Sequence, residues 1–173
     1  MLNIFNFFYQ NKHIRILIVY SSQLGNTEVI ANILYKKIKI LHKDIYELNY
    51  IEDIKIFKEY DYTIFLVSTT GDGEFPDNGI KFWKIFKKYR EDLFIKYCLI
   101  GFGDTNYRSF CHTSKCLQRR LKLLKCKEVI PMVLIDDAIY DEESIKKWIE
   151  DVSNKLCTIE NDIQRRYVNN MRN

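Results

Sequence analysis

Glycines and acids follow an apolar run near the middle of the chain, in the stretch STTGDGEFPDNG at residues 68–79. Gly71 and Gly73 flank Asp72, and glycine is used where the backbone turns with positive φ or passes close to another group. The Pro-Asp-Asn sequence after them predicts a turn into a helix, capped by the acid or the amide. An ordinary long connection is the alternative, but two glycines around one aspartate exceed what a helix cap needs. The loop is therefore a candidate for close contact with a ligand.

The stretch SSQLGNTE at residues 21–28 has the groups to hold a phosphate. Its hydroxyl and amide side chains, its glycine and the free N–H groups of the helix predicted after it all suit an anion. The lysine of nucleoside triphosphatase phosphate loops is missing, which argues against that class and for a terminal monophosphate held by neutral donors. The alternative is a plain helix start with Asn26 or Thr27 as the N-cap.

The stretch GFGDTNYRSF at residues 101–110 again combines glycines with an aromatic residue. Tyr107 is placed to stack on a planar group, a contact worth about 0.5–1.5 kcal/mol beyond burial. A tyrosine at the rim of the core is the alternative. In DDAIYDEE, at residues 136–143, Asp136 and Asp137 are adjacent carboxylates without the further ligands that a metal needs, which favours a solvated acidic rim.

These loops join elements that alternate between two hydrophobic periods. Short apolar runs typical of buried parallel strands are followed by stretches with helical spacing. Strands are predicted at 14–20, 44–49, 61–68, 96–103 and 128–136, and helices at 27–41, 78–89, 114–125 and 142–156, with an irregular piece near 51–58. The alternation predicts an α/β doubly wound parallel sheet, in which ligands bind at the carboxyl ends of the strands.

The composition is that of one ordinary globular domain: 173 residues, 47% hydrophobic and 29% charged, with a net charge of +4. Lysines and arginines lie on the predicted helices without interleaved aromatic residues, so no nucleic-acid partner is expected. The five cysteines are scattered and lack zinc spacing, which favours a reducing, cytoplasmic setting. Residues 1–13 are too short to span a membrane and are expected to be an N-terminal extension, with a domain at 14–157 and a helical tail or linker at 158–173.

With all four loops considered, the chain resembles the flavodoxin-like FMN domain of the diflavin reductases, and most of all the NADPH-dependent diflavin oxidoreductase branch that feeds cytosolic iron–sulfur assembly. The resemblance covers residues 14–157. It depends on SQLGNTE (22–28), STTGDGEFPDNGIKFWKIF (68–86), GFGDTNYRSF (101–110) and VLIDDA (133–138). It implies a five-stranded parallel sheet in the order 2-1-3-4-5 with helices on both faces.

The resemblance also implies a set of FMN contacts. The phosphate would be wrapped by Ser22, Gln23, Leu24, Gly25, Asn26 and Thr27. One edge of the isoalloxazine ring would be lined by Thr69, Thr70, Gly71, Asp72 and Gly73, with the Gly71 carbonyl as partner of flavin N5–H in the semiquinone. The ring and ribityl chain would meet Phe102, Gly103, Asp104, Asn106 and Phe110, with Tyr107 stacked on the outer face and Asp137 near the exposed edge.

Two positions depart from the usual pattern of these domains. Leu24 replaces a threonine of the phosphate loop, and a lost hydrogen bond to a charged group costs about 1.5–3 kcal/mol, so weaker FMN binding is expected. Thr70 stands where some diflavin reductases have an aromatic residue, which leaves Tyr107 as the ring stacker. The acids around the ring are expected to lower the flavin potential and to steer basic partners.

The resemblance implies partners that this sequence does not contain. FAD and NADPH would bind only in a C-terminal reductase module, acting in cis or in trans, so the chain alone is not expected to oxidise NADPH. The acceptor would be a redox protein, with an iron–sulfur assembly protein of the anamorsin type as the candidate. A stand-alone flavodoxin and a flavin-free interaction module are the alternatives. A phospho-receiver domain is excluded because Ser68 and Thr69 stand where its acceptor aspartate would be.

Overall fold

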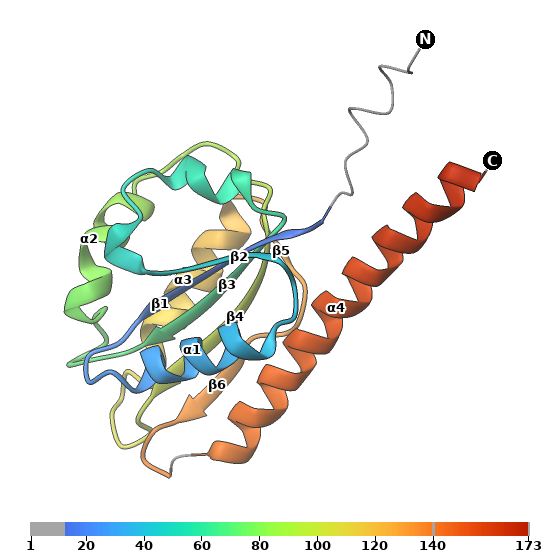
Figure 1. The fold of residues 1–173 in the computed structure, drawn as a ribbon. Helices are drawn as coiled ribbons and strands as arrows, with labels where there is room; N and C mark the ends of the chain where they lie inside the picture. Colours follow the sequence, from blue (N-terminus) through green and yellow to red (C-terminus); the bar gives the residue numbers. More distant parts are fainter. Residues whose placement is uncertain (1–12, 140, 173) are drawn as a thin grey trace.

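The chain folds around one parallel sheet, and the computed structural model describes residues 13–139 and 141–172. The elements follow one another as β1 (Arg15–Ser21), α1 (Asn26–Lys37), β2 (His42–Glu47), η2 (Leu48–Tyr50), η3 (Ile54–Glu59), β3 (Tyr62–Ser68), α2 (Asp77–Phe86), β4 (Lys96–Gly103), α3 (His112–Leu123), β5 (Lys127–Glu128), β6 (Val133–Asp136) and α4 (Glu142–Arg172) (Figure 1). The predicted alternation of strands and helices is confirmed.

The strands lie in the order β2-β1-β3-β4-β5, with β6 also paired to β4, and every pairing is parallel. The expected order 2-1-3-4-5 is confirmed. All seven residues of β3 are buried, because helices cover both faces of the sheet at its centre. The apolar run in the sequence reflects this double coverage.

The fifth strand position is filled by two short strands instead of the single predicted strand at 128–136. β5 pairs with the start of β4 and β6 with its end, and Pro131 lies between them. Proline has no N–H group to donate to a ladder, so it interrupts pairing at this edge of the sheet.

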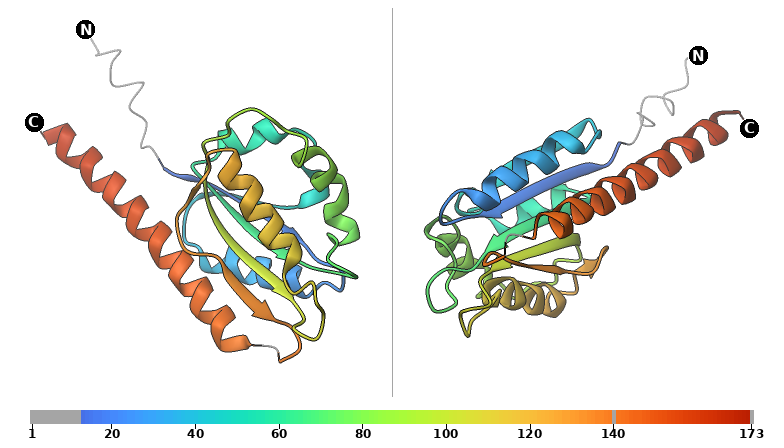
Figure 2. Two further views of the ribbon diagram at one scale, coloured as in Figure 1. Left: turned by 180° about the vertical axis from the view of Figure 1, so that it is seen from behind. Right: turned by 90° about the horizontal axis from the view of Figure 1, so that it is seen from below.

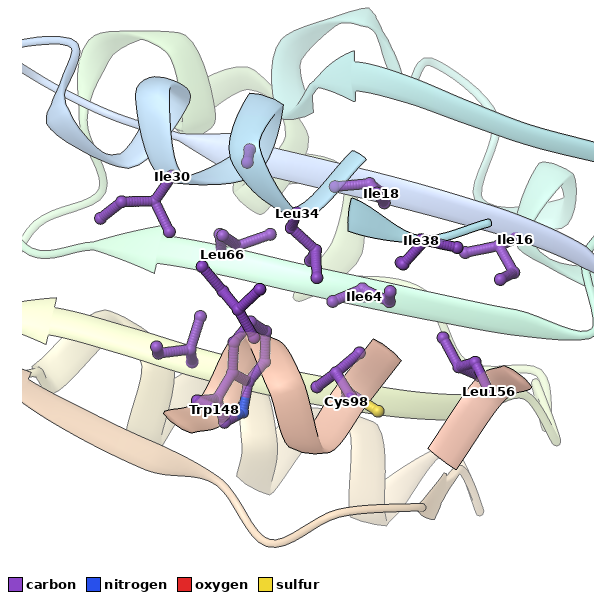
Figure 3. Packing of buried hydrophobic residues seen from close by; sticks show 14 of the residues in the cluster. Ile16, Ile18, Ile30, Leu34, Ile38, Ile64, Leu66, Cys98, Trp148 and Leu156 are labelled. Atoms are coloured by element: carbon purple, nitrogen blue, oxygen red, sulfur yellow. The ribbon is translucent and has the colours of Figure 1, made fainter. Parts of the chain in front are cut away.

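Two helical layers enclose the sheet (Figure 2). On one face, α1 and α4 pack over the strands, and Leu34 and Trp148 meet Ile64 and Cys98 in a closed core (Figure 3). On the other face, α2, α3 and η3 bury a second cluster around Phe57, rich in aromatic side chains. The helices on both faces hold the carboxyl ends of the strands in fixed positions.

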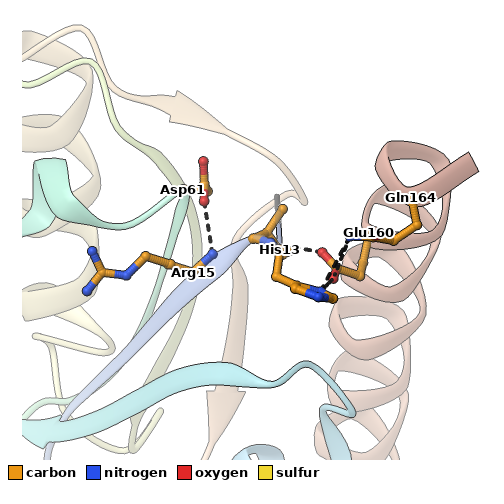
Figure 4. A network of polar contacts seen from close by, with 6 residues as sticks. His13, Arg15, Asp61, Glu160 and Gln164 are labelled. Atoms are coloured by element: carbon orange, nitrogen blue, oxygen red, sulfur yellow. Dashed lines mark hydrogen bonds and ion pairs between the residues drawn. The ribbon is translucent and has the colours of Figure 1, made fainter. Parts of the chain in front are cut away.

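Helix α4 runs without a break from Glu142 to Arg172, through the position where a tail was expected to begin. The Glu160 carboxylate accepts a hydrogen bond from the Ile14 N–H at 2.9 Å and lies 2.5 Å from His13 Nδ1 (Figure 4). This contact ties the middle of α4 to the start of β1. The last turns of α4 extend past the sheet (Figure 1), and the division at residue 157 stays a prediction.

Two sequence expectations concern the ends and the membrane. Residues 1–12 of the predicted N-terminal extension lie outside the described residues. Within residues 13–139 and 141–172, no helix has both the length and the apolar character needed to cross a bilayer.

Candidate functional site

Four loops meet at the carboxyl ends of β1, β3, β4 and β6 and enclose two adjoining cavities. The α1 pocket, of about 300 Å³, is lined by Ser22, Gln23, Leu24, Asn26, Thr27, Ser68, Thr69, Thr70 and Asp137. The Tyr107 pocket, of about 240 Å³, is lined by Thr69, Thr70, Gly71, Asp104, Tyr107, Ser109 and Asp137. The two cavities share Thr69, Thr70 and Asp137, so they form one elongated site with two ends.

The α1 pocket presents backbone N–H groups at the start of a helix. The N–H groups of Gly25 and Thr27 both donate to Ser22 Oγ, at 3.0 and 3.2 Å. Gly25 is the N-cap of α1, so neither Asn26 nor Thr27 caps it. Both amides are engaged by Ser22 Oγ, so a phosphate oxygen would accept them only in place of that hydroxyl. The positive end of the helix dipole at this position favours an anion.

Leu24 and Gln23 contribute differently from what the sequence predicts. Leu24 is 86% exposed at the mouth of the α1 pocket. Gln23 makes paired side-chain contacts with Asp77, donating to its carboxylate at 3.3 Å and accepting from its N–H at 3.2 Å. The amide of Gln23 is therefore engaged with α2 and not with the centre of the pocket.

Asn78 is a residue that sequence reasoning assigned to another role. Its side-chain oxygen accepts the Ser22 N–H at 2.9 Å. The predicted cap of α2 by Asp77 or Asn78 is wrong: Pro76 is the N-cap, and no side chain caps the helix. The Pro-Asp-Asn motif correctly marked a helix start. Only the structure shows that the side chains of Asp77 and Asn78 contact the loop between β1 and α1.

The glycine loop after β3 closes into a tight turn. The Thr70 N–H donates to the Glu74 carbonyl at 3.0 Å, and the Glu74 N–H donates back at 2.9 Å. Gly71 has φ of +51°, and a Cβ added there would lie 2.5 Å from Glu74 Oε2. The predicted need for positive φ is confirmed at this position.

Thr69 is anchored to the start of α3. Its hydroxyl lies 2.7 Å from the Thr113 hydroxyl, which donates in turn to the Ser68 carbonyl at 3.1 Å. Because Thr113 has a single hydroxyl proton, Thr69 must donate to Thr113. The Thr69 hydroxyl therefore donates its hydrogen bond within the protein. Thr70 also lines both pockets, and its side chain is not part of this hydrogen-bond chain.

Tyr107 stands at the outer edge of its pocket with 60% of its surface exposed. Its N–H donates to the Asp104 carbonyl at 3.1 Å, and the Asp104 carboxylate accepts the Asn106 N–H at 2.7 Å. The turn presents the tyrosine ring to the pocket, while Asn106 is exposed and lies outside the lining residues. An exposed ring beside a polar cavity is available to cover a planar group.

Asp136 and Asp137 are adjacent in the chain, but their pKa values are shifted in opposite directions. Hydrogen bonds from the Thr105 hydroxyl at 2.6 Å and from the Thr105 and Ala138 N–H groups hold the pKa of Asp136 below its usual value. Limited hydration within the pocket walls, together with the charges of Asp136 and Asp104, raises the pKa of Asp137 to about 6. Asp137 is exposed to solvent at the wall that the two pockets share.

The structure does not bring every predicted residue to the cavities. Phe102 is only 2% exposed and belongs to the core beneath the loops. Gly103 lies against α3, where a Cβ would stand 2.6 Å from the Cys111 nitrogen, and its carbonyl accepts the Asp137 N–H at 2.7 Å. Phe110 sits beneath the Lys115 ammonium. Gly73 faces a different cavity, between α2 and α3.

Two further residues were missed by sequence reasoning. Ser109 lines the Tyr107 pocket, and its hydroxyl donates to the Asp72 carbonyl at 2.8 Å, so it fixes the glycine loop against the loop after β4. Thr113 does the same for Thr69. Ser109 lies within the motif at residues 101–110, but the resemblance gives it no role, and Thr113 stands directly before the helix predicted at 114–125, so neither residue stands out in the sequence.

The Flavodoxin family model matches residues 18–148, which is most of the chain. The chain belongs to the flavodoxin family. This assignment places it among flavodoxin-like FMN electron-transfer domains and agrees with the sheet order and with a site at the carboxyl ends of the strands.

The chain is similar both to a flavodoxin of about its own length and to segments of much longer proteins. Probable flavodoxin 2 of Bacillus subtilis is 33% identical over 133 residues, 75% of this chain and 86% of that protein. The mitochondrial pyruvate dehydrogenase [NADP(+)] of Euglena gracilis is 29% identical over 150 residues, 83% of this chain but 8% of that protein. NADPH-dependent diflavin oxidoreductase 1 of Aspergillus fumigatus is 30% identical over 128 residues, 66% of this chain and 20% of that protein. The chain thus spans nearly all of one relative and a small part of the others.

A solved structure supports the same fold. The flavodoxin of Streptococcus pneumoniae TIGR4 is 29% identical, with a TM-score of 0.68 over 83% of this chain and 97% of that one. Taken together, the comparisons support homology to both flavodoxins and diflavin reductases, without selecting one branch.

Proposed function

We propose that the chain binds FMN across the two pockets and passes electrons one at a time between redox partners. The observation that carries the proposal is the division of one continuous site into an amide-lined end at α1 and an aromatic, acidic end at Tyr107. A phosphate fits the first end, and a planar ring beside Tyr107 fits the second. A flavin spans these two chemistries in one molecule.

The bound flavin would supply the electron chemistry, and the protein supplies position and electrostatics. Ser22 and Thr27 would hold the phosphate, while Thr70 and the Gly71 turn would line one edge of the ring. Asp104 and Asp137 oppose any gain of negative charge in the Tyr107 pocket. Their charge would lower the reduction potential of a flavin bound there.

Absorption and fluorescence of the purified chain with added FMN test the proposal directly. We expect flavin bands that stay with the protein through a desalting column, and quenched flavin fluorescence on titration. Photoreduced, FMN-loaded protein should then reduce ferricytochrome c, a one-electron acceptor, faster than free photoreduced FMN at the same concentration. A colourless protein with no fluorescence change in excess FMN would overturn the proposal.

We further propose that the chain works with an FAD- and NADPH-binding reductase module, in the manner of the NADPH-dependent diflavin oxidoreductases. The match to that family in Aspergillus fumigatus and the branch-like glycine loop support this assignment. An iron–sulfur assembly protein of the anamorsin type, in the cytoplasm, would then be the acceptor. The length of the native open reading frame tests it: a reductase module encoded downstream of residue 173 is expected.

A stand-alone flavodoxin is the second candidate, because the chain covers 86% of the Bacillus subtilis flavodoxin. Under this alternative, the reading frame ends near the present C-terminus and a separate reductase supplies the electrons. The length of the reading frame separates the two candidates. Reconstitution with NADPH and a purified FAD-containing reductase tests electron transfer to the chain in trans, which both candidates allow.

A further inference from the structure

A third cavity, which we call the α2–α3 pocket, is lined by residues of α2 and α3. It has a volume of about 270 Å³ and an apolar floor, where the rings of Phe75 and Trp83 stack with centroids 4.8 Å apart. Two cations, Lys84 and Lys87, and one anion, Glu74, stand among its polar lining groups. The pocket therefore suits a small ligand with more negative than positive charge.

One cysteine opens onto this pocket with a proton acceptor beside it. Cys116 Sγ lies 3.2 Å from His112 Nε2, and the Arg119 guanidinium donates to the same sulfur at 3.1 Å. His112 and Arg119 are four residues before and three residues after Cys116 on α3, so helical geometry itself brings the three side chains together. A thiol next to an imidazole base and a guanidinium is the arrangement that activates cysteine as a nucleophile.

The other cysteines, all within the described residues, lack this arrangement. Cys98, Cys111 and Cys126 are buried, and burial raises the pKa of their thiols to about 12, 12 and 11. Cys157, like Cys116, is partly exposed. The positions three and four residues away on its helix are serine, asparagine and glutamate, without a cation. Cys157 is thus a built-in control for exposure.

We propose that Cys116 is a modification site for thiol–disulfide exchange with an anionic low-molecular-weight disulfide of the glutathione type. The Cys116 proton passes to His112 Nε2 as the sulfur attacks one sulfur of the disulfide. The new Cys116 S–S bond forms while the S–S bond of the disulfide breaks, and the departing thiolate takes the proton from His112. One protein thiol and one disulfide thus give one mixed disulfide and one free thiol, with no other oxidant.

The lining of the pocket determines which disulfide is favoured. Oxidised glutathione has more carboxylates than amines, so Lys84 and Lys87 match its excess negative charge and Glu74 its amines. A cationic disulfide such as cystamine has no partner for its charge beyond Glu74. The site is therefore expected to react faster with the anionic disulfide.

Site-resolved mass spectrometry of the full chain, without flavin, tests the proposal. After incubation with oxidised glutathione, Cys116 should form the adduct about tenfold faster than Cys157, since both thiols are partly exposed and only Cys116 has the imidazole and guanidinium beside it. The ratio of glutathione to cystamine rates should be higher at Cys116 than at Cys157. Equal adduct rates at the two cysteines, or equal ratios, would overturn the proposal.

Variants separate the two parts of the mechanism. His112→Gln keeps a polar side chain at an exposed position and should slow the Cys116 reaction about tenfold, because base assistance is lost. The double variant Lys84→Glu and Lys87→Glu should reverse the preference for the anionic disulfide without slowing cystamine. Far-UV circular dichroism checks the fold of each variant. An unchanged Cys116 rate in a folded His112→Gln protein would also overturn the proposal.

Discussion

The α1 pocket and the Tyr107 pocket share a wall, yet they present opposite chemistry to a ligand. The α1 pocket is lined by Ser22 and Thr27 at a helix start, where the N–H groups of Gly25 and Thr27 converge on Ser22 Oγ. The Tyr107 pocket offers an exposed aromatic ring beside Asp104. Asp137, in the shared wall, is the one carboxylate that lines both. A ligand that uses the whole site must be anionic at one end and planar at the other.

The two pockets divide phosphate binding, in the α1 pocket, from control of charge around the ring, in the Tyr107 pocket. The α1 pocket attracts a phosphate without a cationic side chain, because the helix dipole at the start of α1 favours a negative charge. The acidic end provides little attraction for an anion and instead disfavours added negative charge. Riboflavin, which lacks the phosphate of FMN, reports on the Tyr107 pocket alone and makes the contrast measurable.

Ser22→Ala should have the largest effect. The Ser22 hydroxyl organises the two converging amides, and a hydrogen bond to a charged group is worth about 1.5–3 kcal/mol, so FMN affinity should fall about ten- to hundredfold. Riboflavin affinity should not change. Fluorescence titration with both ligands measures the effect, and an equal loss for riboflavin would show that the two pockets are not separate.

Tyr107→Ala should weaken both ligands by a similar, smaller factor. Loss of stacking costs about 0.5–1.5 kcal/mol, which is about two- to tenfold in affinity. Tyr107→Phe is the matched control, because it keeps the ring and removes only the hydroxyl, and it should bind both ligands almost normally. Unchanged affinity in Tyr107→Ala would remove the tyrosine from the site.

Leu24→Thr should strengthen FMN binding by a few fold and leave riboflavin unchanged. The leucine is 86% exposed, so little packing is lost. Because solvent competes for a hydroxyl at this exposed position, the added donor is worth less than the roughly 1.5–3 kcal/mol of a hydrogen bond to a charged group, about 0.5–1.5 kcal/mol. Val29→Thr is the control, because Val29 is 59% exposed on the helix that follows Leu24 and lines neither pocket. The same gain in both variants would mean that solubility, and not the pocket, had changed.

Asp137→Asn should have the smallest effect on affinity and a distinctive pH dependence. Above pH 6 the carboxylate is charged and repels the phosphate, so the variant should bind FMN up to about fivefold more tightly at pH 8. Near pH 5 the wild-type carboxyl is protonated and the ratio should approach one. Comparing the ratio of the two proteins cancels the titration of the phosphate itself.

The same residue makes a prediction for stability without ligand. The folded-state pKa of Asp137, about 6, lies above its ordinary value of 3.8, so stability from its protonated form is lost as pH rises between these values. Asp137→Asn should therefore raise the melting temperature relative to wild type above pH 6 and not below pH 4. Asp136→Asn should act in the opposite direction, because the pKa of Asp136 is lowered by its hydrogen bonds and its ionised form is stabilising. A rise in both variants would contradict the assignment.

Much of the fold follows from local pattern. The buried strands, their parallel pairing and the loops at their carboxyl ends were all predicted from hydrophobic period and connection length, which depend on neighbouring residues. The strand order 2-1-3-4-5 came from the family resemblance. The prediction of a single strand at 128–136 was wrong at Pro131. The apolar run favours a strand there, but proline has no N–H group to pair with β4, so the pairing is interrupted. Helix ends were misjudged at α1 and α2, where glycine and proline precede the polar residues expected to cap.

The sequence by itself determined which loops could bind a ligand. Three features are visible residue by residue: glycines in a loop, an aromatic residue in a second glycine loop, and a phosphate loop without lysine. Only the tertiary structure decided which side chains of those loops are free to use. Asn78 holds Ser22, Thr113 takes the Thr69 proton, and Thr105 occupies Asp136 while Asp137 stays in the pocket. The reason is physical: hydrogen-bond partners and hydration depend on residues far apart in the chain, and these meet only when the sheet and its helices have packed.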